Sequence, residues 1–476
     1  MGVVREAFEE FWQSGVSKAG VVLLAILTAI SIYVVLTMPM DFGTRYWNNP
    51  LYWADNPKAV PPAWVNHLSK VKHTVHTILI ASQPVGVSYK TGVYLKYYNM
   101  TYNYVYDDFP SFITLKISNV TFYSEPPVIQ LYITRPDGFI IPLYTLSIPS
   151  QPSGLPPYRV FSKGSKRILL SGDLYVARAL SNFLYEKYGV FLGTTNVMQI
   201  GHEQIVFGDM VNKTYFKPLK GKYIISIVLL THDLRDSIGR VEFVIGGRVY
   251  GLMGTDTLGR DLAKGLLFGF PVALLIGFVT SIFTTIIGAS LGIISGYVGG
   301  KIDELIQRFA DIVNNVPLLP ILIFLCFIFK GNLWVMIAAL IAFGWPGLTI
   351  VVRSMVLQIK SAQFVEAAIS LGASKWRIMA RHIFPNVAPF ILAQLIFFTP
   401  SAILSEAALS FLGLGDPRIP TWGQILEYGF RNQAIFLGYW WWILPPGILI
   451  IISAVTFVFI ALGLEPVVNP RLRRWR

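Results

Sequence analysis

Six long apolar runs divide the chain, and each is long enough to cross a membrane as a helix. They cover residues 20–38, 270–296, 312–329, 333–352, 390–412 and 440–464. A membrane-spanning helix needs about 20 predominantly apolar residues, which these runs supply. No small-residue cleavage site follows the first run at Thr37, Met38 and Pro39, so we interpret it as a retained span rather than a signal peptide. The pattern predicts a polytopic α-helical membrane protein with six transmembrane helices.

The region between the first two runs, residues 41–251, is different: it is polar, aromatic and rich in turn residues. Period-two alternation predicts strands, and these fall at residues 114–123, 128–134, 223–229 and 240–245, with a turn at 135–138 and one helix at 173–188. A region of this size buries a core without disulfides. We therefore expect a β-rich, sandwich-like α+β domain inserted between helices 1 and 2.

Composition supports a membrane protein and excludes two other classes. Of the 476 residues, 54% are hydrophobic and 14% are charged, and the mean hydropathy is +0.55, which is too apolar for a soluble protein of this size. The net charge of +13 does not indicate a nucleic-acid partner, because Lys and Arg outside the 41–251 region gather beside the apolar runs. The one cysteine, Cys326, lies inside a run and excludes an intrachain disulfide.

Basic residues predict the orientation, since they gather on the cytoplasmic side of membrane proteins. They precede the first run, join the second to the third and the fourth to the fifth, and end the chain, at Arg5, Lys18, Lys301, Arg308, residues 353–381 and residues 471–476. With six spans, all of these segments lie on one side. We expect cytoplasmic termini and an extracellular domain at 41–251. Arg260 and Lys264 oppose the rule, and Asp256 and Asp261 partly offset them.

Two further features bear on the 41–251 domain. Asn99, Asn119 and Asn212 each begin an Asn-x-Thr triplet, and no such triplet occurs elsewhere, so they are candidate N-glycosylation sites that agree with an external location. The aromatic residues suit two roles, either binding sugar rings or a partner, or packing in the core; they include Trp47, Trp53, Trp64, Tyr97, Tyr98 and Tyr102.

Between the fourth and fifth runs lies a polar, basic segment that reads EAAISLGASKWRIMARHIFPN at residues 366–386. It cannot cross a bilayer, because each charge costs about 2.5–3.5 kcal/mol at mid-depth. We expect Glu366, Ala367 and Ala368 to open a short helix that Gly372 breaks. A second, amphipathic helix carrying Arg377 should then end at Pro385. The segment must lie outside the hydrocarbon, exposed to another protein.

Other polar positions are candidates for a cap or for a transport path. In GTDTLGRD, residues 254–261, Asp256 or Thr257 is placed to cap the start of the second span. Glu406 lies deep in the fifth run, where an ionisable group either faces a water-filled path or bonds to a neighbouring helix. Ser281 and Thr285 in the second run are further candidates to line a path.

Several segments together resemble one family. The 366–386 segment is similar to the EAA loop of ABC importer permeases. Asp256, Gly259, Arg260 and Asp261 in GTDTLGRD, the GYVGG of 296–300 and the SEAALSFLGLG of 405–415 resemble the C-type permease of dipeptide and oligopeptide importers, as do Trp422 and Gly423 in PTWG. The resemblance covers residues 252–464. Its departure is the 41–251 domain, since typical members have a short connection there.

The resemblance implies a plasma-membrane complex. Its partners are a homologous second permease, two ATPase subunits bound at 366–386 and an extracellular substrate-binding protein. The chain has no phosphate-binding GxxxxGK[ST] motif, so ATP and Mg²⁺ belong to the ATPases, and we expect no catalytic residue, cofactor or metal here. The implied domains are 1–40, 41–251, 252–466 with a coupling loop at 353–389, and a basic tail at 467–476.

The substrate remains open among oligopeptides, cello- or malto-oligosaccharides and metal chelates. A membrane-anchored receptor or assembly protein is an alternative class, which predicts no ATPase partner. A secondary transporter should carry ion-coupling carboxylates in several spans, whereas Glu406 stands nearly alone.

Overall fold

The computed structural model describes residues 11–148 and 154–468. Contacts between Cα atoms divide the chain into two compact units. The helical unit comprises the residues up to Asn49 and those from Leu262 onward, and the β-rich unit comprises Pro50–Asp261. The β-rich unit therefore takes in the GTDTLGRD loop and leaves residues 41–49 with the helices. Most of the predicted basic tail, from residue 469, lies outside the described residues.

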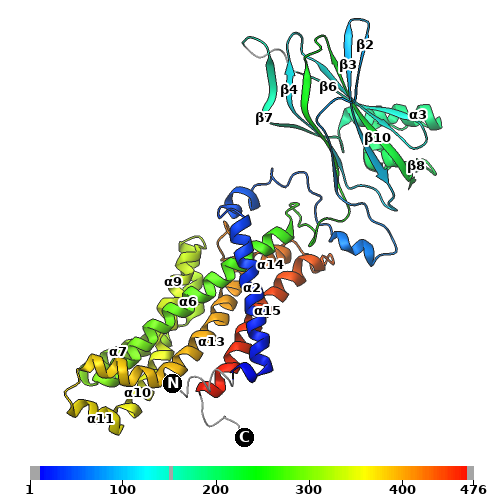
Figure 1. Ribbon diagram of the computed structural model, residues 1–476. Helices are drawn as coiled ribbons and strands as arrows, with labels where there is room; N and C mark the ends of the chain where they lie inside the picture. The colour runs from blue at the N-terminus through cyan, green and yellow to red at the C-terminus, as the bar shows by residue number, and fades with distance from the viewer. Residues whose placement is uncertain (1–10, 149–153, 469–476) are drawn as a thin grey trace. The chain divides into compact units, whose positions relative to one another are not determined.

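The helical unit is built from long apolar helices and several short ones (Figure 1). They are α2 (Gly15–Thr37), η1 (Gly43–Trp47), α6 (Leu262–Val298), α7 (Gly300–Asn315), α8 (Leu318–Ile328), α9 (Leu333–Gly344), α10 (Pro346–Lys360), α11 (Gln363–Ser370), α12 (Lys375–Ile378), η3 (Met379–Ile383), α13 (Phe384–Phe411), α14 (Trp422–Arg431) and α15 (Trp440–Val468). Within the described residues, five helices are long and apolar enough to cross a membrane, or six if the bent pair α7–α8 counts as one span.

The third predicted span is not one straight helix. α7 and α8 are bent by 76° at Val316 and Pro317, so the expected helix at 312–329 is wrong as a single element. Val316 has extended backbone, with φ −75° and ψ 125°, as expected for a residue that precedes a proline. Hydropathy gives the length of an apolar run but not the direction of the helix axis along it. α8 has 11 residues, fewer than the roughly 20 that a span needs.

Glycines on α6 bring α10 unusually close. Gly288, Gly292 and Gly296 recur every four residues, so they lie on one face of the helix. An added Cβ would lie 2.9, 2.8 and 2.7 Å from the nearest atoms of α10 or of Trp345. The Thr349 hydroxyl also donates to the Gly288 carbonyl at 3.0 Å. α6 and α10 therefore form a tightly packed pair.

The β-rich unit has two antiparallel sheets around one core (Figure 1). The four-stranded sheet has the order β1-β11-β4-β7, and the five-stranded sheet has the order β2-β3-β10-β5-β6. The elements are η2 (Ala63–His67), β1 (Thr77–Ala81), β2 (Gly86–Lys90), β3 (Val93–Tyr104), β4 (Ile113–Phe122), β5 (Val128–Thr134), β6 (Ile140–Ser147), β7 (Tyr158–Leu169), α3 (Leu174–Tyr188), α4 (Thr194–Ile200), α5 (His202–Phe207), β8 (Gly208–Met210), β9 (Phe216–Pro218), β10 (Gly221–Thr231) and β11 (Ser237–Ile245).

Alternating residues of each strand fill this core. The core lies between the two sheets, as in a sandwich. The five-stranded sheet contributes Tyr98 and Tyr102 of β3, and the four-stranded sheet contributes Ile113 and Ile117 of β4. The expected β-rich region is confirmed, and the buried tyrosines act as core residues. Trp53 is also buried, whereas Trp64 is partly exposed.

The two chain segments that enter and leave the sandwich are paired with each other. The N–H groups of Ala63 and Ala59 donate to the carbonyls of Gly251 and Asp256 at 2.9 and 2.7 Å. The Asn56 side chain donates to the Gly259 carbonyl at 2.9 Å. These bonds attach the GTDTLGRD loop to the first segment of the β-rich unit.

Candidate functional site

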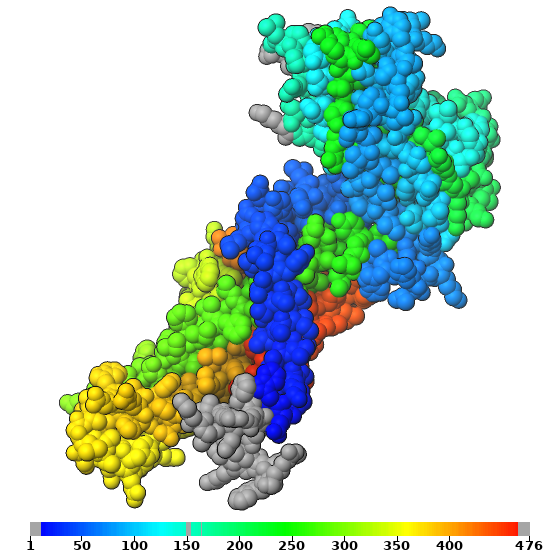
Figure 2. Space-filling view, viewed as in Figure 1, coloured from blue at the N-terminus to red at the C-terminus, as the bar shows by residue number. Residues whose placement is uncertain are grey.

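A polar segment projects at one end of the helical unit, beside α7 and α10, and we name Gln363–Ile383 the coupling segment (Figures 1 and 2). Its apolar side chains divide between two faces. Val365 and Ile378 are buried against α6 and α10. In contrast, Leu371 is 87% exposed and Trp376 is 72% exposed, although both are large apolar residues. An exposed apolar face within a charged segment is typical of a protein-binding surface.

The EAA residues follow the first three residues of α11. α11 begins at Gln363, and Glu366 and Ala367 face solvent, whereas Ala368 packs inward. Glu366 therefore lies in the first turn of α11, which begins three residues before the expected start. A small residue at the exposed Ala367 leaves room for the close approach of another protein.

Gly372 makes the bend that the sequence predicts. Its φ is +78°, in the left-handed region that favours glycine, so this conformational prediction is confirmed. Its N–H donates to the Ile369 carbonyl at 2.9 Å, and the next N–H, of Ala373, donates to Ala368 at 3.1 Å. The carbonyls at the end of α11 are thereby satisfied.

Pro385 does not end the second helix. α12 begins after Ser374, whose hydroxyl accepts the N–H of Arg377 at 3.4 Å, and continues through η3 into α13. Pro385 is the second residue of α13, directly after the π-helical turn η3 that joins α12 to α13. Arg377 and Pro385 are both exposed. The expected boundary is wrong because a proline within a helix can kink it without ending it, and α13 also continues past Pro389 and Pro400.

The GTDTLGRD loop is organised by one buried ion pair. The Asp256 carboxylate accepts the N–H groups of Leu258 and Arg260, each at 2.9 Å, and pairs with the Arg260 guanidinium at 2.5 Å. Gly259 has φ +81° and completes the turn. Asp256 therefore caps this loop and not α6, which begins six residues later, so the expectation of a helix cap is wrong. The pairing also explains how Arg260 departs from the charge rule. Asp261 is buried directly before α6.

Trp422 and Gly423 fix α14 against the long helices. The Trp422 indole N–H donates to the Leu266 carbonyl at 2.9 Å, and its ring meets Phe270 edge-on at 5.1 Å. A Cβ on Gly423 would lie 2.7 Å from the Ala407 carbonyl, so this glycine permits close contact with α13. α14 and the coupling segment lie at opposite ends of the helical unit (Figure 1).

Glu406 holds the junction of α13 and α14. It is 4% exposed and accepts a hydrogen bond from Ser410 at 2.6 Å. Ser410 in turn contacts the hydroxyl of Thr421, the residue that caps α14. Ser281 and Thr285 are also buried, and Ser281 accepts from Thr399 at 3.1 Å.

The loop between α13 and α14 carries a buried carboxylate, Asp416. Burial by itself raises the pKa of Asp416, but hydrogen bonds from the Arg418 side chain and N–H outweigh it and lower that pKa. Asp416 also accepts the Leu333 N–H at the start of α9. Asp416 therefore ties this loop to α9, an element that the sequence motifs did not indicate.

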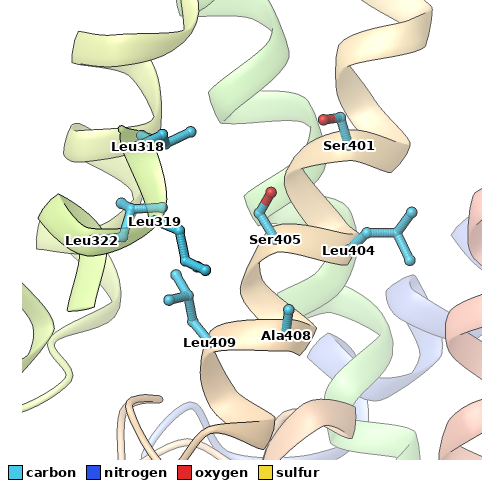
Figure 3. A pocket seen from close by; sticks show the side chains of 8 residues that line it. All are labelled: Leu318, Leu319, Leu322, Ser401, Leu404, Ser405, Ala408 and Leu409. Atoms are coloured by element: carbon cyan, nitrogen blue, oxygen red, sulfur yellow. The ribbon is translucent and has the colours of Figure 1, made fainter. Parts of the chain in front are cut away.

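A pocket of about 370 Å³ lies between α8 and α13. Figure 3 shows three leucines of α8 facing two hydroxyls of α13, one turn apart. Its lining consists of Leu318, Leu319, Leu322, Ser401, Leu404, Ser405, Ala408 and Leu409. None of the three predicted path residues, Glu406, Ser281 and Thr285, is among them. Sequence reasoning missed Ser401 and Ser405, although each lies in the same apolar run as Glu406.

The candidate modification sites all face solvent. Asn99, Asn119 and Asn212 are exposed and belong to the β-rich unit. Among residues 11–148 and 154–468, no group of three His, Cys, Asp or Glu side chains is arranged to hold a metal ion.

These features define a polytopic helical membrane protein with a pocket between two of its helices and an exposed apolar face at one end. A family model described as "Binding-protein-dependent transport system inner membrane component" matches residues 288–474. The dipeptide transport system permease protein DppC of Lactococcus lactis is 35% identical, over 46% of this chain and 64% of its own length. The DppC of Bacillus subtilis is 34% identical, over 46% and 69%. The oligopeptide transport system permease protein OppC of Haemophilus influenzae is 35% identical, over 47% and 71%.

The chain belongs to this family, the inner membrane permeases of binding-protein-dependent ABC importers, and within it to the C-type dipeptide and oligopeptide permeases. It spans 64% to 71% of the length of these relatives. Among solved structures, inward-facing conformations of the MetNI methionine ABC transporter are similar at 18% identity. The TM-score of 0.35, over 43% of this chain and 98% of that chain, is too low to establish a shared fold.

Proposed function

We propose that this protein forms half of the pathway of an ABC importer for oligopeptides. In this proposal residues 312–329, which hold the end of α7 and all of α8, form the third span, which gives six spans with cytoplasmic termini. The β-rich region, residues 41–251, then lies outside the plasma membrane between spans 1 and 2. The observation that carries the proposal is the exposed apolar face of the coupling segment, at the end of the helical unit opposite to α14.

The coupling segment is the docking surface for one of the two ATPase subunits, and that of the homologous permease docks the other. Leu371 and Trp376 enter a groove of the ATPase, the exposed Ala367 permits close approach, and Glu366 pairs with a basic residue there. ATP and Mg²⁺ belong to these partners, so this chain itself is not an enzyme. Closure of the ATPases on ATP draws the coupling segments of the two homologous permeases together, and the spans change between inward and outward openings.

The pocket between α8 and α13 is the proposed contact for the substrate. Its leucines accept apolar side chains, and Ser401 and Ser405 supply hydroxyls that hydrogen-bond to peptide groups. The relatives named for dipeptide and oligopeptide transport support a peptide substrate. An extracellular binding protein delivers it. Uptake of a labelled oligopeptide, but not of a cello-oligosaccharide, is expected in proteoliposomes that hold the whole complex.

The topology is tested by cysteine labelling, because the native Cys326 is buried. Leu371→Cys and Lys213→Cys each place a thiol on an exposed position, one in each unit. A membrane-impermeant maleimide should label Lys213→Cys on intact cells and Leu371→Cys only on inside-out vesicles. Labelling of Leu371→Cys from outside would overturn the proposal.

Asn99, Asn119 and Asn212 are the proposed N-glycosylation sites. The Asn212 side-chain oxygen accepts the N–H groups of Thr214 and Tyr215 at 3.0 and 2.8 Å, which presents this triplet in an exposed turn. Peptide mass spectrometry of protein from its own cells should find glycan there, and Thr214→Ala should remove it. Unmodified peptides at all three asparagines would contradict this assignment.

A further inference from the structure

An ion pair joins α7 to α10 at the end of the helical unit where the coupling segment lies. The Arg353 guanidinium donates from Nε and Nη2 to the two oxygens of Asp303, each at 2.6 Å. The side chains are 30% and 16% exposed. A bidentate, partly buried pair fixes both distance and orientation, which a single contact does not. We name this pair the clamp.

α6 contributes to the same junction. The Ser295 hydroxyl donates to Asp303 at 2.5 Å, and the Gln307 amide donates to Ser295 at 2.9 Å. Ser295 lies one residue before Gly296, where α6 and α10 are closely packed. Three helices therefore meet at one carboxylate, and Arg353 reaches it from 50 residues away in the sequence.

α7 buries few of its side chains within this chain. The structure describes all of α7, and within this helix only Ala310 is fully buried. Its apolar residues Ile302, Leu305 and Ile312 are exposed. Besides the clamp and the Gln307–Ser295 bond, Phe309 of α7 stacks on Trp345, the cap of α10, with ring centroids 5.8 Å apart. The clamp is consequently the most directional connection between α7 and α10.

The clamp lies between the coupling segment and the pocket. Arg353 is on α10, the helix that leads through Ser361 and Ala362 into α11. Asp303 is on α7, which continues through the 76° bend into α8. Leu318, Leu319 and Leu322 of α8 form one wall of the pocket in Figure 3. A displacement of α10 that is passed to α7 therefore moves that wall relative to α13.

We propose that Asp303 and Arg353 are positioning residues that transmit motion of the coupling segment to the α8 wall of the pocket. This inference rests on the proposed function. Without the clamp, α10 moves with the ATPases while α7 and α8 stay behind. ATP hydrolysis then continues, but it no longer changes the pocket.

The test uses the whole transport complex in proteoliposomes. Asp303→Asn and Arg353→Gln should each leave ATP hydrolysis within about twofold of wild type and reduce uptake at least about fivefold, the lower bound for typical coupling free energies. The double variant should be no worse than either single one, because both remove the same interaction. Arg431→Gln is the matched control, since it breaks the exposed Arg431–Glu427 pair within α14 and should change neither rate.

A second measurement separates transmission from mere stability. Leu319→Cys with Ser405→Cys places two thiols across the pocket. Their cross-linking yield should change on ATP addition in the otherwise wild-type complex and should not change when Asp303→Asn is added. Restored uptake on exchanging the charges, Asp303→Arg with Arg353→Asp, would add support.

Each outcome is decisive. Wild-type uptake by Asp303→Asn, or an ATP-dependent cross-link that persists in it, overturns the clamp and leaves the proposed function standing. Loss of hydrolysis together with uptake in an assembled complex also overturns it, because the pair would then serve stability alone. Absence of ATP-driven uptake in the wild-type complex would instead overturn the proposed function.

Discussion

Replacing Gly372 with alanine isolates the bend of the coupling segment from every other effect. Its backbone is left-handed, with φ +78°, and no atom lies within 4 Å of the place that a Cβ would occupy. Steric conflict with neighbours is therefore absent, and only backbone strain remains. An L-residue in this conformation costs about 1–2 kcal/mol.

That strain should weaken binding of the ATPase subunits. If the ATPase recognises the bent segment, a cost of about 1–2 kcal/mol raises its Kd about 5- to 30-fold. The assay is a titration of fluorescent ATPase subunit onto the permease complex in nanodiscs. Gly372→Asn should raise the Kd less than Gly372→Ala does, because asparagine tolerates the left-handed region better than alanine.

Gly347→Ala is the matched control for this prediction. Gly347 also has no atom within 4 Å of its Cβ position, but it lies in α10 and has no positive φ. Alanine there should leave the Kd unchanged. A wild-type Kd for Gly372→Ala would refute the reasoning that the bend presents the docking surface.

Three further predictions concern stability. Trp422→Ala should destabilise the helical unit by about 3–5 kcal/mol, since it empties a buried site and removes the bond to Leu266, whereas Trp376→Ala, at an exposed site, should change thermal unfolding in detergent by less than about 0.5 kcal/mol. Burial lowers the pKa of His76 to about 4, although the charge of Asp55 raises it. The unfolded chain takes up this proton near pH 6.5 and the folded chain only near pH 4. The free energy of unfolding should therefore decrease by up to about 3 kcal/mol as the pH is lowered from 6.5 to 4. Hydrogen exchange of β3 and β10 should show this loss of stability in wild type but not in His76→Phe. Burial alone raises the pKa of Asp137, but bonds from Arg135 and Lys187 lower it to about 2. Its contribution is therefore present above about pH 4 and lost as pH falls through 2, and Asp137→Asn should abolish that acid transition in the same exchange measurement.

The apolar helices were predictable because charged residues are costly inside a membrane, so each span appears in the sequence as a long apolar run almost free of charge. The predicted spans at residues 20–38 and 440–464 correspond to α2 and α15 within a few residues at most ends. The bend between α7 and α8 was missed because hydropathy has no direction. Pro317 is its visible sign, and a proline after a polar amphipathic helix marks such a break.

In the β-rich unit, strands with one buried face were predictable and others were not. β5 begins and ends at the predicted residues, since its side chains alternate between the core and the surface. β2 is exposed along its whole length, and β7 carries basic residues at its edge position, so neither has a clear hydrophobic period. Edge strands commonly carry charge in place of that period.

The candidate site depends on contacts that no local pattern contains. Asp256 was predicted to cap a helix because it lies shortly before an apolar run. The loop that pairs it with Arg260 cannot be read from the sequence pattern. Asp303 and Arg353 are 50 residues apart and meet only because α7 and α10 converge. Gly372 was predictable, because a glycine that follows a helix commonly takes the left-handed conformation.

Photo-cross-linking from Leu371 tests the central claim most directly. A photoreactive amino acid at this 87% exposed position should join the protein to an ATPase subunit, with a yield that changes on ATP addition. The same group at Phe191, an exposed position of the β-rich unit, should give no such product. Absence of an ATPase adduct at Leu371 in an intact complex, or its appearance at Phe191 instead, would contradict the account.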